Sequence, residues 1–206
     1  RSPSRGLGDV YKRQVTLLEF MRGRHQNFRV FSDATQFFWQ GISPYTTEFV
    51  EAHGRYFLYS PVFTVLFAPF AYLPAWLGPF AWNLFNYSLF FMAIFTLPQQ
   101  FIQQQKCRMF LFLLLILGQS LLSFQYNITV AYLFLFAYTL LEKDRGFLAV
   151  LLIMISGCTK VYGIFELALL LCYPHVWRNF GYAVAMGIVL LALPLIKIAP
   201  ADLLPY

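Results

Sequence analysis

Charged residues are scarce in this chain of 206 residues. Asp, Glu, Lys and Arg together make up 12% of it, and only 9 residues are acidic, whereas an ordinary soluble domain is about a quarter charged. Hydrophobic residues reach 59%, aromatic residues reach 20%, and the mean hydropathy is +0.60. A soluble protein of this size needs more charged residues than this to cover its water-exposed surface. The composition therefore predicts an integral membrane protein.

Cysteine is also rare. Cys107, Cys158 and Cys172 are odd in number, lack CxxC spacing and have apolar neighbours, which argues against a disulfide framework and against a cysteine metal site. Basic residues are too few and too scattered for a nucleic-acid surface, and half of the formal net charge of +6 comes from residues 1–14. We interpret the other Lys and Arg residues as topology signals. The sequence predicts no cofactor and leaves a metal requirement open.

The two ends of the chain indicate a fragment. Residues 1–14, RSPSRGLGDVYKRQ, lack the apolar stretch of a signal peptide and resemble an adapter-derived translation found at the ends of metagenomic gene fragments. We interpret them as a non-native scar. Residues 15–21 are then the stub of a truncated first transmembrane helix, and the abrupt ADLLPY ending indicates that the C-terminal side is incomplete as well.

Residues 22–75 are predicted to form an outer loop with juxtamembrane helices. Apolar residues recur at helical spacing over Phe31–Phe38, which predicts a short helix with one polar face. Residues 57–75 are apolar enough to span but are interrupted by proline, which removes a helix hydrogen bond. We therefore expect short interfacial helices broken near Pro61 and Pro69 in place of one crossing.

Residues 76–206 are predicted to be a transmembrane bundle of about six spans. The expected spans are Trp76–Leu97, Met109–Phe124, Ile128–Leu141, Phe147–Thr159, Val161–Tyr173 and Gly181–Ile198. Several of them are shorter than the roughly 20 residues of a full crossing, so tilt, local thinning or broken geometry must supply the difference. The predicted fold class is an all-α, polytopic transmembrane helix bundle.

Basic residues fall in alternate connections of this bundle. They are Lys106 and Arg108, Lys143 and Arg145, and His175 and Arg178. By the positive-inside rule their side is cytoplasmic, and the loop of residues 22–75 faces outside. The alternative, a crossing by residues 57–75 with the loop inside, stays open.

Seven short sequence strings follow one another along the chain: NFRVF, GISPY, YSPVFTVLFAPFAYLP, WNLFN, FQYN, LLEKDRGFLA and TKVYGI. In this order and spacing the chain resembles glycosyltransferase family 87 over about residues 26–180. The resemblance implies a membrane-embedded (GT-C-like) glycosyltransferase fold. It also implies a polyprenyl-phosphate-linked sugar donor, with mannose as the first candidate sugar, and an envelope glycan or glycolipid as acceptor. The site would lie on the non-cytoplasmic face of a bacterial plasma membrane.

One position departs from the family. Many members carry an Asp near the start of the first outer loop as the proposed catalytic carboxylate, whereas Asn27 stands at the corresponding place here. An amide cannot take a proton from an attacking hydroxyl. We therefore expect the general base to be Asp33 or Glu48, with Glu51 as the third candidate.

Transfer from a lipid-phosphate donor also needs cations that hold the departing phosphate. Candidates are His53, Arg55 and Lys160, although Lys160 could simply be a snorkelling lysine that marks the interface. Gln125 and Asn127 are candidate sugar-binding groups, and Asn27 is kept as a substrate-binding candidate. For Glu166, within an apolar run, we expect a structural role with a partner on another helix or a wet cavity.

Other functions remain possible from the sequence. A permease or lipid flippase would show charges distributed through its helices and often an internal inverted repeat, and neither pattern is present. The chain could also be an inactive fragment of an active enzyme. The hypothesis we retain is a membrane-embedded hexosyltransferase.

Overall fold

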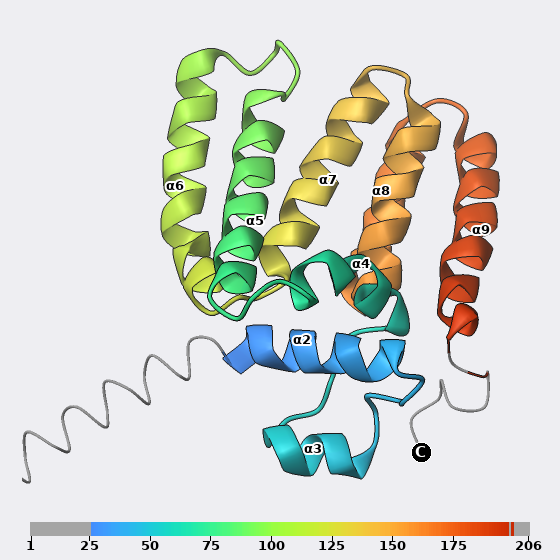
Figure 1. Ribbon diagram of the computed structural model, residues 1–206. Coiled ribbons are helices and arrows are strands. Elements are labelled where there is room, and N and C mark those ends of the chain that lie inside the picture. Colours follow the sequence, from blue (N-terminus) through green and yellow to red (C-terminus); the bar gives the residue numbers. More distant parts are fainter. Residues whose placement is uncertain (1–25, 198, 200–206) are drawn as a thin grey trace, which may run out of the picture.

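The computed structural model describes residues 26–197 and residue 199, and every regular element in this part of the chain is a helix (Figure 1). The predicted all-α class is therefore confirmed. The interpretations of residues 1–14, of the stub at 15–21 and of the C-terminal end lie outside the described residues.

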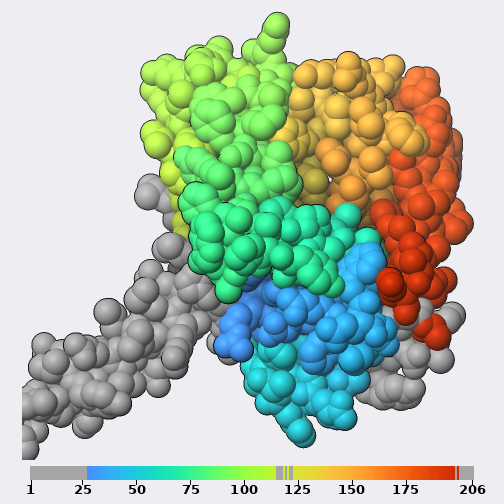
Figure 2. Space-filling model, in the orientation of Figure 1, coloured from blue at the N-terminus to red at the C-terminus, as the bar shows by residue number. Residues whose placement is uncertain are grey.

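Two groups of helices make up the molecule. Three helices lie across one end: α2 (Gln26–Trp39), α3 (Thr47–His53) and α4 (Pro61–Ala71). The others stand beside one another: α5 (Leu77–Phe95), α6 (Gln103–Leu122), α7 (Asn127–Glu142), α8 (Gly146–Thr159), the 3₁₀ helix η1 (Val161–Cys172), α9 (Val176–Ala192) and the short 3₁₀ helix η2 (Leu193–Ile196). The space-filling view shows α2 and α3 of this group in blue and cyan at that end of the molecule, with α4 in teal next to them (Figure 2).

Local sequence explains α2 and α3. In α2 the buried side chains of Phe28, Phe31, Ala34 and Phe38 recur every three or four residues, which places them on one helix face. Helix α3 begins after Thr46, whose hydroxyl accepts from the backbone N–H of Phe49, and it ends at Gly54 in a left-handed conformation with φ 64°.

Helix α4 differs from the sequence prediction. Pro61 is its first residue, where a missing N–H costs nothing, so the expected break at Pro61 is correct. The expected break at Pro69 is wrong, because Pro69 lies inside the last turns of one continuous helix. With 11 residues α4 is about 16 Å long, roughly half of a hydrocarbon core, so it does not cross one by itself.

The upright helices follow the expected spans closely, with three differences. Helix α9 begins at Val176, five residues before the expected Gly181. Helix α6 begins at Gln103, six residues before the expected Met109, because the polar run Gln103–Arg108 is itself made of good helix formers. The expected span at Val161–Tyr173 is the 3₁₀ helix η1. A 3₁₀ helix rises about 2.0 Å per residue, so these 12 residues extend about 24 Å, further than the α form would.

Close packing accompanies this geometry. A Cβ on Gly163 would lie 2.6 Å from the Ser156 carbonyl carbon, so η1 approaches the backbone of α8 at a distance that only glycine permits. At the same contact the Ser156 hydroxyl donates to Glu166 Oε1 at 2.8 Å. The expected partner of Glu166 on another helix is thus Ser156.

Among the described residues, one helical stretch, Val176–Ile196, is long and apolar enough by itself to cross a membrane. The apolar helices α4, α7, α8 and η1 are shorter, with 10 to 17 residues each. Three buried clusters hold the molecule together: one joins α2, α4 and α5, one joins α5, α6 and α7, and one joins α7, α8, η1 and α9.

Candidate active site

A polar pocket lies beside α2, where it meets the α6–α7 and α8–η1 connections. It has a volume of about 630 Å³ and contains two basic residues, Arg55 and Lys160. Its other polar lining residues are Asn27, Tyr56, Tyr59, Gln125 and Asn127. We call it the cationic pocket. Five of the six predicted substrate-binding residues lie in it, and only His53 is outside.

Lys160 reaches this pocket because its backbone is extended, with φ −138° and ψ 118°, between α8 and η1. Its ammonium donates to Asn127 Oδ1 at 2.8 Å and lies 5.2 Å from the ring centre of Tyr59. Burial lowers the pKa of Lys160 below its ordinary value. In the described part of the chain no carboxylate forms an ion pair with it. Its charge is therefore available to an anionic ligand.

The amides of the pocket are held in place. Asn27 Nδ2 donates to the Ser123 carbonyl at 2.8 Å, while Asn27 Oδ1 accepts from Arg55 at 3.3 Å. Asn127 Nδ2 donates to Gln125 Oε1 at 3.0 Å. Asn27 thus orients a basic side chain, which an Asp at this position would instead bind as an ion pair.

Tyr162 is a pocket neighbour that sequence reasoning missed. Its phenol donates to Asn127 Oδ1, and its ring centre lies 4.8 Å from the Lys160 ammonium. The signal was available in the string Thr-Lys-Val-Tyr, where an aromatic residue follows the lysine by two positions. An extended backbone at Lys160 was needed to bring both side chains to one amide.

The predicted base Asp33 forms a pair with His53. His53 Nε2 lies 2.8 Å from Asp33 Oδ2, and His53 Nδ1 lies 2.8 Å from the Phe49 carbonyl oxygen. Since a carbonyl can only accept, Nδ1 carries a proton, and the contact between Nε2 and Oδ2 then needs a second proton shared by the two groups. His53 also stacks on Phe49 with ring centres 4.2 Å apart. The pair fixes Asp33 and ties α3 to α2.

The three predicted carboxylates lie apart from the cationic pocket. Glu48 and Glu51 are exposed on α3, and neither lines a described pocket. Asp33 lines a different pocket, on the other face of α2. The structure therefore brings Arg55 and Lys160 together and separates them from the three predicted bases, whereas the third phosphate-binding candidate, His53, contacts Asp33.

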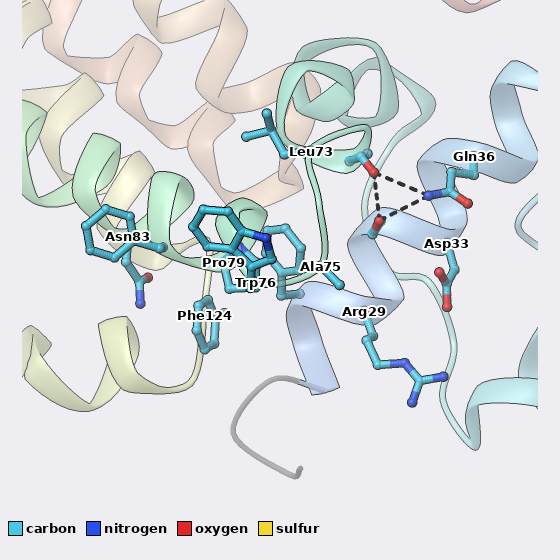
Figure 3. Close-up of a pocket in the computed structure, with 13 residues that line it drawn as sticks. Arg29, Asp33, Gln36, Leu73, Ala75, Trp76, Pro79, Asn83 and Phe124 are labelled. Atoms are coloured by element: carbon cyan, nitrogen blue, oxygen red, sulfur yellow. Dashed lines mark hydrogen bonds between the residues drawn. The ribbon is translucent and has the colours of Figure 1, made fainter. Parts of the chain in front are cut away.

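The second pocket is a groove of about 880 Å³ between α2 and the start of α5 (Figure 3). We call it the α2–α5 groove. The side chains of Arg29 and Asp33 extend from the same side of α2, while Trp76, Asn83 and Phe124 lie toward the other end (Figure 3). Sequence reasoning assigned none of its residues except Asp33, because their contacts depend on how α2 packs against α4 and α5.

In the described part of the chain, no group of three or more His, Cys, Asp or Glu side chains is placed to hold a metal ion.

Comparison with known protein families decides the class of protein. The family model for glycosyltransferase family 87 matches residues 57–206. The chain belongs to glycosyltransferase family 87. The glycosyltransferase prediction is therefore confirmed. The members of this family are membrane enzymes. No curated protein and no solved structure gives a significant match.

The family 87 match divides the site. It includes Gln125, Asn127 and Lys160 but begins after Asn27, Asp33, Glu48, Glu51, His53 and Arg55. Membership in family 87 thus supports the activity, whereas the roles of individual residues rest on their geometry.

Proposed function

We propose that this chain is a polytopic membrane glycosyltransferase that moves a hexose from a polyprenyl-phosphate donor to an envelope glycan or glycolipid, with mannose as the first candidate sugar. The cationic pocket carries the proposal. It places Arg55 and Lys160 together with three amides, and the two cations have amide neighbours in place of carboxylates. A phosphate that departs with negative charge is stabilised by such preorganised cations and donors.

The position of the pocket supports a lipid-linked donor. Arg55, Asn127 and Lys160 lie at the end of the upright helices that carries α2, α3 and α4 (Figure 1). Helices of this bundle expose large apolar side chains, such as Phe91 of α5 and Ile188 of α9. A donor could keep its hydrocarbon chain beside these helices while its phosphate enters the pocket.

In our proposal this end of the bundle lies outside the cell, which the distribution of basic residues supports. The α7–α8 connection with Lys143 and Arg145 lies at the opposite end, as does Arg178 near the start of α9 (Figure 1). A multi-pass arrangement with these residues in the cytoplasm obeys the positive-inside rule. The cationic pocket then opens on the non-cytoplasmic face of the plasma membrane.

Asp33 is our choice of general base. The contact of its Oδ2 with His53 fixes the carboxylate, while Oδ1 makes no hydrogen bond within the described part of the chain. In the proposed step the acceptor hydroxyl gives its proton to Asp33 as its oxygen bonds to the sugar C1. The bond from C1 to the phosphate oxygen breaks, and polyprenyl phosphate leaves with the electron pair. Glu48 and Glu51 remain the alternatives.

The test measures transfer of a labelled hexose from a synthetic polyprenyl-phosphate donor in membranes, with matched expression. Lys160→Ala and Arg55→Ala should each raise the KM for the donor by roughly tenfold to a hundredfold, because hydrogen bonds to charged groups contribute about 1.5–3 kcal/mol. Arg145→Ala, an exposed basic residue at the opposite end, is the matched control and should leave the KM unchanged. If the control and the two pocket variants behave alike, the pocket does not bind the phosphate.

A further inference from the structure

The α2–α5 groove combines two kinds of surface. Trp76 and Phe80 are large aromatic side chains that are 76% and 64% exposed, respectively. Arg29, Asp33, Gln36 and Asn83 supply hydrogen-bonding groups to the same groove. Its volume of about 880 Å³ falls in the range of roughly 300–1,000 Å³ that is usual for ligand pockets.

This combination matches the chemistry of a pyranose. A sugar ring has faces made of C–H groups, which pack on the face of an aromatic ring, and an edge of hydroxyls, which donate to carboxylates and amide oxygens and accept from guanidinium and amide N–H groups. The groove supplies one basic side chain, Arg29, and one acidic side chain, Asp33, one helical turn apart. With this balance it suits a neutral carbohydrate better than a phosphate, which the cationic pocket suits.

The polar side of the groove is organised before any ligand binds. The Ser32 hydroxyl donates to the Ala71 carbonyl at 3.2 Å, and Gln36 Nε2 donates to the same carbonyl at 3.3 Å (Figure 3). Gln36 Oε1 makes no hydrogen bond to the residues that the structure describes, which leaves it as an acceptor for a ligand hydroxyl. Asp33 is fixed by His53 at 2.8 Å. Side chains that are already fixed lose little conformational entropy on binding.

The groove and the cationic pocket are neighbours along two stretches of chain. Asn27 lines the pocket and Phe28 lines the groove, while Phe124 lines the groove and Gln125 lines the pocket. The two sites therefore lie on either side of the first turn of α2, with Asp33 on the side of the groove. We infer that the α2–α5 groove binds the carbohydrate acceptor of the transfer reaction, with Trp76 and Phe80 packing on its rings and Gln36, Asn83 and Asp33 binding its hydroxyls.

This inference rests on the proposed function, so the experiment reads the two sites separately. Binding of di- and trisaccharides of mannose, glucose and galactose to the full chain in detergent micelles is measured by saturation-transfer NMR. Binding of polyprenyl phosphate is measured on the same samples. Trp76→Ala should weaken binding of the preferred oligosaccharide about tenfold or more, and Trp76→Phe should restore much of it, because a flat ring is retained. Neither variant should change polyprenyl phosphate binding.

Trp177→Ala is the matched control, since Trp177 is 88% exposed near the start of α9, away from the groove. It should leave oligosaccharide binding unchanged. Equal oligosaccharide binding by the Trp76→Ala and Trp177→Ala proteins would overturn the inference and leave Trp76 as a membrane-interface residue. Polyprenyl phosphate binding without binding of any of these sugars would overturn the acceptor site alone. If the unaltered chain does not bind polyprenyl phosphate, the proposed function itself would be overturned.

Discussion

Two lysines at opposite ends of the upright helices show how differently the same side chain is used. Lys106 of α6 is 8% exposed, and its ammonium donates to the carbonyls of Phe95 and Leu97, where α5 ends. Lys160, at the other end, donates to an amide oxygen and lies beside two tyrosine rings. Lys106 therefore satisfies backbone groups of the fold, whereas Lys160 faces a pocket.

The surroundings of each charge explain the difference. The last carbonyls of a helix have no partner within the helix and carry partial negative charge, so a cation there stabilises the fold. An ammonium group has three N–H donors, and one amide oxygen accepts from only one of them, which leaves the other donors for a ligand. We therefore expect different effects at the two ends of the molecule. Variants at the α2–α4 end should change catalysis, and variants at Lys106 should change stability.

The largest expected effect is on turnover at the α2–α4 end. Asp33→Asn should lower kcat by roughly 10²–10⁴, the usual cost of removing a proton-transfer group, while the KM for the donor changes little because Asp33 lies outside the cationic pocket. The measurement is initial-rate transfer from a synthetic polyprenyl-phosphate-hexose at several donor concentrations.

Glu48→Gln and Glu51→Gln provide the comparison for Asp33, because both carboxylates are exposed on α3. Each should keep near-parental turnover. If either one loses turnover while Asp33→Asn retains it, the base belongs to α3, and the Asp33–His53 pair is a structural link between helices.

An intermediate effect is expected on stability at Lys106. Lys106→Met keeps the length of the side chain but removes the donor, so buried carbonyls at the end of α5 lose a partner, which costs about 1–3 kcal/mol. For a domain of this size that lowers the Tm by several degrees. Thermal unfolding in detergent measures it, with Lys143→Met as the exposed control. A parental Tm for Lys106→Met would show that the capping contacts contribute nothing.

The smallest effect concerns pH. Burial lowers the pKa of Lys160, so its ammonium loses the proton at a lower pH than an ordinary lysine does. Donor affinity should therefore fall as the pH rises into the alkaline range. Lys160→Arg should flatten this dependence, because an arginine stays charged. Parallel pH profiles of donor KM for the two proteins would show that Lys160 does not titrate against the donor.

Much of the fold was predictable because helices depend on short-range patterns. Apolar runs, polar connections and proline positions correctly indicated the upright helices, and Pro61 correctly indicated the start of α4. Pro69 misled because a proline near a helix C-terminus removes only one hydrogen bond, which packing of Phe67 and Ala71 in the buried cluster outweighs. The 3₁₀ form of η1 was not predictable, since it accompanies the close approach of Gly163 to Ser156 on another helix.

The site was predictable as a set of residues but not as an arrangement. Charge and polarity in an apolar sequence selected Arg55, Asn127 and Lys160 as candidates, and these lie together in the cationic pocket. The same reasoning selected Glu48 and Glu51, which lie on the exposed side of α3. Composition shows that a polar group is unusual in such a chain, but not which way its side chain points.

By itself the sequence determined the class of molecule: low charge and long apolar runs indicate an all-α chain, and ordered motifs from YSPVF to TKVYGI indicate family 87. Only the tertiary structure decided that α2 separates a cationic pocket from the groove with Asp33, that His53 fixes this carboxylate, and that Lys106 caps α5. The physical reason is distance along the chain. Helical periodicity is set by neighbours three and four residues apart, whereas the contact of Lys160 with Asn127 spans 33 residues and exists only after the helices have packed.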